Sequence, residues 1–132
     1  MALLDDIAGV LEDAGVGTFG TDLFAASFPA EAPDDCLAIF EYSGGAGEDA
    51  FGGGGPAIEQ PRVQVMGRGG RYEVVRAKVH DAYLALLAVA DQQLDGRTYQ
   101  CINALQPPFA TGVDAKGLHR VTCNFEVYKD PE

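Results

Sequence analysis

One long amphipathic segment does most to limit the folds open to this chain. Over residues 71–91, apolar residues recur at spacings of three and four, the pattern of one face of a helix. The stripe comprises Tyr72, Val75, Val79, Ala82, Leu86 and Val89, and it is widened by Tyr83, Leu87 and Ala90. A stripe of this width needs a broad apolar surface to cover it, and a β-sheet supplies one. We therefore expect a helix over this range, packed on a sheet.

Other segments predict the sheet and a second helix. Alternation is clearest over 118–128, where Val121, Cys123, Phe125 and Val127 share one side of a strand. Three more strands are expected at 36–42, 58–66 and 97–105, and a first helix at 3–14. This order predicts an α+β fold, a mostly antiparallel sheet of four to five strands with two main helices packed on one face. The length of 132 residues fits a single domain, 1–132.

Glycine is concentrated in one stretch of the chain. Seven of the 17 glycines fall within residues 44–55. Because glycine loses the most conformational entropy on ordering and has no side chain to bury, we expect a flexible loop over 44–55. This stretch lacks the Gly-Lys-Ser/Thr ending of a phosphate-binding loop and carries Glu48 and Asp49 instead. Those carboxylates would repel a phosphate, so no nucleotide site is expected there.

A second glycine-rich stretch, 67–70, is expected to form the turn before the long helix. A dinucleotide-binding fingerprint would need its third glycine at the position of Tyr72, so this motif is incomplete. What remains is a helix N-terminus flanked by Arg68 and Arg71. Two interpretations stay open: a generic anion site, or an ordinary solvated turn.

Charge is distributed unevenly along the chain. The formal net charge is −11, and residues 1–61 contain 12 Asp and Glu with no Lys or Arg, whereas residues 62–132 contain 8 acids and 9 bases. An acidic chain is an unfavourable partner for nucleic acid and for anionic membrane surfaces. The asymmetry either serves solubility alone or supports self-association, in which an acidic patch of one subunit meets a basic patch of the next.

The sequence predicts neither an enzyme nor a cofactor. The only histidines, His80 and His119, are not grouped with Cys, Asp or Glu in a pattern typical of a triad or a zinc site. The three cysteines form no Cys-x-x-Cys pair, and their odd number suits a reducing cytosol. The longest apolar run, 82–90, is shorter than the roughly 20 residues of a membrane span, and we expect a protein that is soluble and not exported.

Three short motifs, in this order, carry a family resemblance. The first is Ile-Phe-Glu-Tyr-Ser-Gly-Gly at 39–45, and the second is Pro-Arg-Val-Gln-Val-Met-Gly-Arg-Gly at 61–69, followed by Tyr72. The third is Asp-Ala-Lys-Gly-Leu-His-Arg at 114–120, which leads into Asn-Phe-Glu-Val. Together they resemble the small phage tail terminator proteins, often catalogued as phage minor capsid proteins. The resemblance spans roughly residues 36–128, and this chain departs from the pattern in its glycine-rich insert and at Leu118, where a polar residue is common.

The resemblance implies a structural role in a virion. A protein of this kind caps the growing tail tube as a ring, a homohexamer, and stops its polymerisation. Its partners would be other copies of itself, the tail tube protein and a head-completion or neck protein, with DNA only passing through the lumen and no membrane involved. It would lie at the head-proximal end of the tail, after assembly in the cytoplasm of the host bacterium.

The charge pattern and the resemblance together suggest a subunit interface. We hypothesise that Arg62, Arg68 and Arg71 contact acids of the adjacent subunit, for which Asp34, Asp35, Glu48 and Asp49 are candidates. Exposed ion pairs contribute about 0 to 1 kcal/mol each, so apolar contacts must supply most of the stability of a ring. Two other roles stay open: a head-completion or neck adaptor, and a small-ligand-binding module, which a pocket with converging titratable groups would favour.

Overall fold

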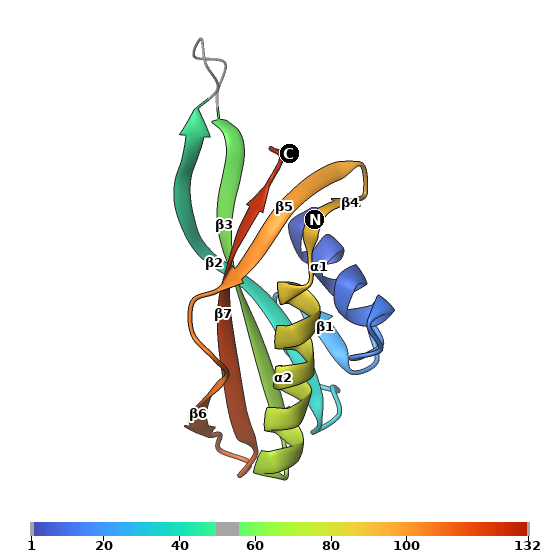
Figure 1. Ribbon diagram of the computed structural model, residues 1–132. Coiled ribbons are helices and arrows are strands. Elements are labelled where there is room, and N and C mark those ends of the chain that lie inside the picture. The colour runs from blue at the N-terminus through green and yellow to red at the C-terminus, as the bar shows by residue number, and fades with distance from the viewer. Residues whose placement is uncertain (1, 50–55, 132) are drawn as a thin grey trace.

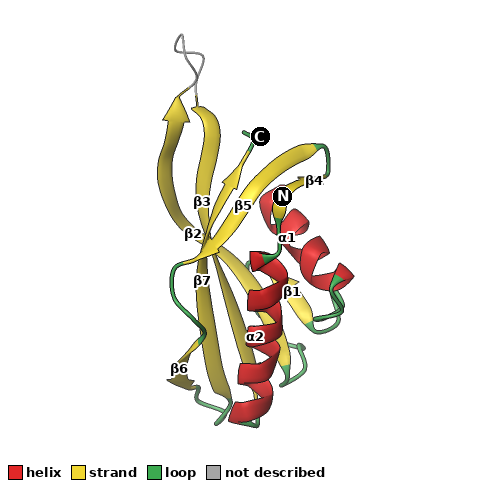
Figure 2. Ribbon diagram, viewed as in Figure 1, coloured by secondary structure: helices red, strands yellow, loops and turns green. Residues whose placement is uncertain are grey.

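The computed structural model describes residues 2–49 and 56–131, which form two helices and seven strands (Figure 1). In chain order these are α1 (Ala2–Asp13), β1 (Leu23–Ala25), β2 (Cys36–Asp49), β3 (Pro56–Gly69), α2 (Tyr72–Leu87), β4 (Ala90–Leu94), β5 (Arg97–Ala104), β6 (Phe109–Val113) and β7 (His119–Lys129). The sheet has the order β1-β2-β3-β7-β5-β4, and β6 pairs with β7 outside this path. Both helices lie against one face of the sheet (Figure 2), and the opposite face, within the described residues, carries no helix.

The predicted α+β class is confirmed, but the predicted sheet was too small and too uniform. The sheet has seven strands instead of four to five, and it is mixed, because β1 runs parallel to β2. Sequence analysis did not find β1, β4 or β6. β1 has only three residues, and all five residues of β6 are exposed, so neither shows the alternation that marks a strand. Main-chain pairing with a neighbouring strand, β2 for β1, β5 for β4 and β7 for β6, produces these elements.

The long helix is shorter than predicted at its C-terminal end. α2 ends at Leu87, and Ala90 begins β4, which pairs with β5. Asp91, the predicted last helical residue, has a φ of 46°, which lies in the left-handed region and is incompatible with a right-handed helix. The apolar pattern extends past the helix because Val89, outside it, is buried in the same core.

β2 and β3 form a long hairpin that includes part of the glycine-rich stretch. The predicted loop over 44–55 was wrong for 44–49, because these residues belong to β2 and face β3, with Gly44 opposite Pro61 and Glu48 opposite Ile58. Main-chain hydrogen bonds require no side chain, so a facing strand can order glycines that lack an apolar pattern. Residues 50–55 of the predicted loop lie outside the described residues. The turn predicted over 67–70 was also misplaced, since 67–69 belong to β3.

The apolar core lies between the helices and the sheet. α2 packs on β3, β7 and β5, while α1 packs on α2, β1 and β2. One polar contact is buried beside this core: the Tyr99 hydroxyl of β5 donates a hydrogen bond to the Asp6 carboxylate of α1 at 2.6 Å. The Arg97 guanidinium lies 3.5 Å from the same carboxylate. A buried carboxylate is stable only with such partners, so this contact holds α1 in place against β5.

Gly67 of β3 provides the space in which α2 lies on the sheet. A Cβ atom at this position would lie 2.5 Å from Cγ2 of Val79 and 3.1 Å from Cγ1 of Val75, both in α2. It would also lie 3.2 Å from a methyl group of Leu37 in β2. These distances are too short for ordinary packing. Glycine is therefore needed here for the close approach of helix and sheet.

Gly67→Ala is expected to destabilise the protein by about 1 to 3 kcal/mol, because the added methyl group forces α2 away from β3. Urea unfolding followed by circular dichroism measures the change. The matched control is Gly70→Ala, since a Cβ on Gly70 meets no atom within 4 Å. Equal stability of the two variants would contradict this role for Gly67.

Candidate functional site

Arginines on the helix-free face are held by contacts within their own chain. Arg68 of β3 and Arg120 of β7 are opposite each other in the strand register. Their guanidinium groups lie over the ring of Phe28, 4.7 Å and 5.5 Å from its centre. Arg68 also donates hydrogen bonds to the main-chain carbonyls of Pro33 and Asp34. These contacts fasten the loop between β1 and β2 to the sheet.

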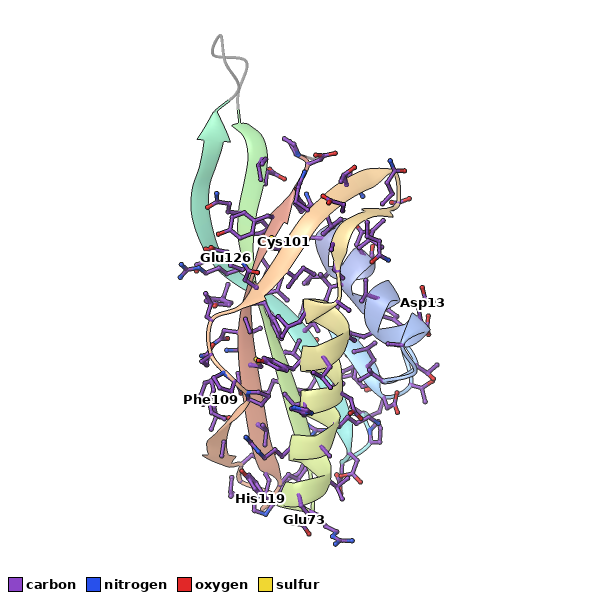
Figure 3. The ribbon with its side chains drawn as sticks, viewed as in Figure 1. Asp13, Glu73, Cys101, Phe109, His119 and Glu126 are labelled. Carbon is purple, nitrogen blue, oxygen red and sulfur yellow. The ribbon has the colours of Figure 1, made fainter. Side chains whose placement is uncertain are left out.

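The start of α2 gathers several of the residues predicted to form an interface. The Asp35 carboxylate accepts a hydrogen bond from the Gly70 amide at 3.2 Å, just before the helix. Arg71 keeps 74% of its side chain exposed and pairs with Glu73 at 3.1 Å. Glu73 and His119 lie together at this end of the molecule (Figure 3). The predicted anion site here is thus already approached by a carboxylate of the same chain.

The other predicted residues lie on the β2–β3 hairpin and its neighbour. Arg62 pairs with Glu126 of β7 at 3.2 Å. The Tyr128 hydroxyl donates to the same carboxylate at 2.6 Å, and this bond, followed by the contact with Arg62, lowers the pKa of Glu126. Glu48 and Asp49 belong to β2, but their side chains lie outside the described residues. The seven predicted residues therefore fall into two regions. One lies near the start of α2 and contains Asp34, Asp35, Arg68 and Arg71, and the other is the β2–β3 hairpin, with Glu48, Asp49 and Arg62.

The described residues offer no arrangement suited to metal binding. No group of three or more His, Cys, Asp or Glu side chains among them could hold a metal ion. Cys123 is buried and donates to the Gln106 carbonyl at 3.2 Å, and burial raises the pKa of its thiol to about 11. A thiol with such a pKa is a poor nucleophile at neutral pH. In the described part of the chain, neither helix is long and apolar enough to cross a membrane.

Sequence analysis did not predict two surface features of the protein. The first is β6, an outer strand of five exposed residues, Phe-Ala-Thr-Gly-Val, with no charged side chain. Outer strands commonly carry charges that prevent pairing with other chains. The second is an open groove beside α1, about 260 Å³ in volume, lined by Asp5, Ala8, Gly9, Glu12 and Phe19. A glycine inside an amphipathic helical pattern, at Gly9, was the one sequence signal for it.

The turn between β6 and β7 is tightly ordered around one carboxylate. Asp114 Oδ1 accepts hydrogen bonds from the amides of Lys116 at 2.9 Å and Leu118 at 3.0 Å. The bond from Leu118 is the largest cause that lowers the pKa of Asp114. Gly117 has a φ of 79°, which closes the turn at little steric cost. Lys116 is exposed on this turn.

Comparison with known protein families identifies the family of this chain. A family model described as "Bacteriophage tail terminator protein" matches residues 10–130. The chain belongs to this family. The resemblance found in the motifs over 36–128 is therefore confirmed, and the match also includes part of α1, all of β1 and the loop between β1 and β2. Tail terminators are structural proteins of phage tails, which agrees with the expected structural role.

A solved structure shares the fold described above. It is a chain of the virion of a native gene transfer agent (GTA) particle, with a TM-score of 0.69 and 18% sequence identity. The match covers 98% of this chain and 96% of that chain. At this level of identity the likeness concerns the fold alone. No curated protein sequence matches the chain.

The order of the β6–β7 turn is expected to depend on pH. Since the pKa of Asp114 is lowered in the folded protein, its contribution is complete above the ordinary aspartate pKa and is lost as pH falls through the lowered value. Hydrogen-exchange protection of the Lys116 and Leu118 amides should decrease in that acidic range. Asp114→Asn, which cannot ionise, is the control and should show no such step. Protection that is independent of pH in the parent protein would contradict the assignment.

Proposed function

We propose that six copies of this chain form a ring that caps the tail tube, stops its polymerisation and offers a docking surface to the head-completion or neck proteins. Membership of the tail terminator family supports this role, and so does a fold shared with a chain of a gene transfer agent virion. The protein then acts as a non-enzymatic part of the virion at the head-proximal end of the tail. It assembles in the cytoplasm of the host bacterium, without a membrane partner.

The observation that carries this proposal is a sheet with two unlike outer edges. One edge is formed by β1, which pairs only with residues 37–39 of β2, and by the part of β2 that extends past β1. β4 and β6 form the other edge. A contact between unlike edges of successive copies is heterologous, and such a contact generates a ring when the rotation between copies closes. The family role and the shape of the sheet thus favour the same assembly.

Strand directions are compatible with pairing across this contact. β1 and β2 run in the same direction as β7, whereas β6 runs antiparallel to β7. When copies repeat around an axis close to the strand direction, β6 of one copy lies antiparallel to β1 and β2 of the next. Antiparallel pairs are slightly more stable than parallel ones. The absence of charge on β6 removes an ordinary obstacle to such pairing.

The net charge fits a ring through which DNA passes. Six copies carry 6 × −11, or −66 charges. A negative lumen repels the phosphate backbone, so DNA slides through and is not held. DNA is then a passing cargo, while the tail tube protein and the head-completion or neck protein are the lasting partners.

The charged residues predicted from the sequence remain proposed contacts of the ring. Each of the three predicted arginines has a partner in its own chain, but Arg71, paired with Glu73, keeps 74% of its side chain exposed. Arg71→Glu is expected to lower the yield of rings on tail tubes most strongly at low salt, where charge interactions are least screened. Arg71→Lys, which keeps the charge, is the control. A yield equal to that of the control at every salt concentration would remove Arg71 from the interface.

The role itself is tested by electron microscopy of particles from a phage or prophage in which this reading frame is interrupted. Tails of abnormal and variable length without heads are expected, because nothing stops tube polymerisation. Supplying the intact chain from a plasmid should restore normal length. Tails of normal length beside separate filled heads would instead assign the protein to the neck as an adaptor, and normal virions would refute both roles.

A further inference from the structure

The outer face of α1 contains a groove whose composition is unusual for an isolated subunit. The groove is lined by Asp5, Ala8, Gly9 and Glu12 of α1 and by Phe19. The Phe19 ring is held beside the helix because its amide donates to the Glu12 carboxylate at 3.0 Å. Phe19 is nevertheless 45% exposed. An exposed aromatic ring next to carboxylates is typical of a protein contact surface.

Gly9 has no packing role inside its own chain. A Cβ atom built on Gly9 meets no atom within 4 Å, in contrast to Gly67, and its φ is not in the left-handed region. Glycine inside a helix costs about 1 kcal/mol relative to alanine. The subunit alone therefore gives no reason for glycine at this position. Close approach by another chain does give one, because a missing side chain lets that chain reach the helix backbone.

The groove lies at the β1 edge of the sheet. Phe19 forms an isolated bridge with Leu23, the first residue of β1, so it extends that edge. β6 belongs to the opposite edge. Phe109 of β6 and Asp13 at the end of α1 lie on opposite sides of the molecule in Figure 3. In a head-to-tail ring, the groove of one copy therefore faces the β6 edge of the next.

The β6 edge presents groups that complement the groove. Val113, the last residue of β6, is 59% exposed, and Lys116 is exposed on the ordered turn that follows. The groove offers Phe19 and a glycine for the apolar group. For the ammonium group it offers the Asp5 carboxylate and the Glu12 carboxylate, which also accepts the hydrogen bond from the Phe19 amide. Because Asp114 already orders the turn, little conformational entropy is lost when it docks.

We propose that the groove beside α1 receives the β6–β7 turn of a second copy of this chain. Val113 packs against Phe19 over Gly9, and the Lys116 ammonium lies between the Asp5 and Glu12 carboxylates. This inference rests on the proposed ring and assigns α1 as the acidic side of the subunit interface. The contact is heterologous, since the groove and the turn are different parts of each copy.

Disulfide trapping tests the contact directly. The variant Glu12→Cys/Lys116→Cys is supplied to the phage with the interrupted reading frame, and purified tails are oxidised and analysed on non-reducing gels. A ladder of covalent multimers up to the full ring is expected. A mixture of the two single variants should give dimers only, because each chain then has one introduced cysteine and can form one disulfide bond. The parent protein controls for its native cysteines, of which Cys36 and Cys123 are buried and Cys101 is half-buried.

Charge exchange provides a second and independent measurement. Lys116→Glu is expected to lower the fraction of tails with normal length, because a third carboxylate then faces Asp5 and Glu12. Glu12→Lys in the same chain should restore this fraction in part. Glu31→Lys makes the same charge change as Glu12→Lys in the loop between β1 and β2, outside the groove, and should not rescue Lys116→Glu. Thermal unfolding of each purified variant verifies that the subunit folds.

The outcomes separate this contact from the function on which it rests. Normal tails without any covalent ladder, or rescue of Lys116→Glu by Glu31→Lys as well as by Glu12→Lys, would overturn the contact and leave the terminator role intact. Loss of the terminator role is seen separately, as normal virions when the reading frame is interrupted.

Discussion

The close packing of α2 on the central strands is the contact on which the rest of the structure depends. Gly67 allows α2 to lie directly on β3, with Val75 and Val79 of the helix beside it, and α2 also packs on β7 and β5. α1 packs beside α2 and over β1 and β2, and its Asp6 also binds Tyr99 of β5. With both helices on one face, the sheet edges are open for assembly, while the loop between β1 and β2 covers part of the opposite face through Phe28. The proposed ring requires open surfaces of this kind for contacts between copies.

The acids of the first half of the chain do not form one patch. Asp6 is buried against Tyr99, and Asp35 binds the Gly70 amide, so these two carboxylates stabilise the subunit. Those on the outer face of α1, including Glu12 and Asp13, are exposed. The acidic residues of the first half of the chain therefore fall into two groups. Some stabilise the fold, and others are exposed on its surface. Only the second group can serve self-association, which moves the expected acidic side of the interface toward α1.

Prediction from the sequence succeeded where burial on one side imposes a period. The helix over 3–14, most of the helix over 71–91 and the strand over 118–128 show such periods, and each is found as α1, α2 or β7. It failed where main-chain pairing alone decides the structure. The residues of β6 are all exposed, and the glycines at the end of β2 have no side chains, so neither leaves a pattern to detect. Prediction of the interface residues met a similar difficulty, because it used charge alone. In the structure, Arg68 contacts Phe28 and Pro33 of its own chain, and Arg62 binds Glu126.

The sequence by itself determined the α+β class, the two helices, the central strands and the family, because apolar periodicity and short motifs are local properties. Only the tertiary structure decided which charges are free. Whether a carboxylate or guanidinium is already bound depends on the groups beside it in the folded chain. These groups can be distant in sequence, as Tyr99 and Asp6 are, 93 residues apart in the chain. The same holds for the sheet edges, since a strand is an outer strand only by virtue of what the rest of the chain leaves unpaired.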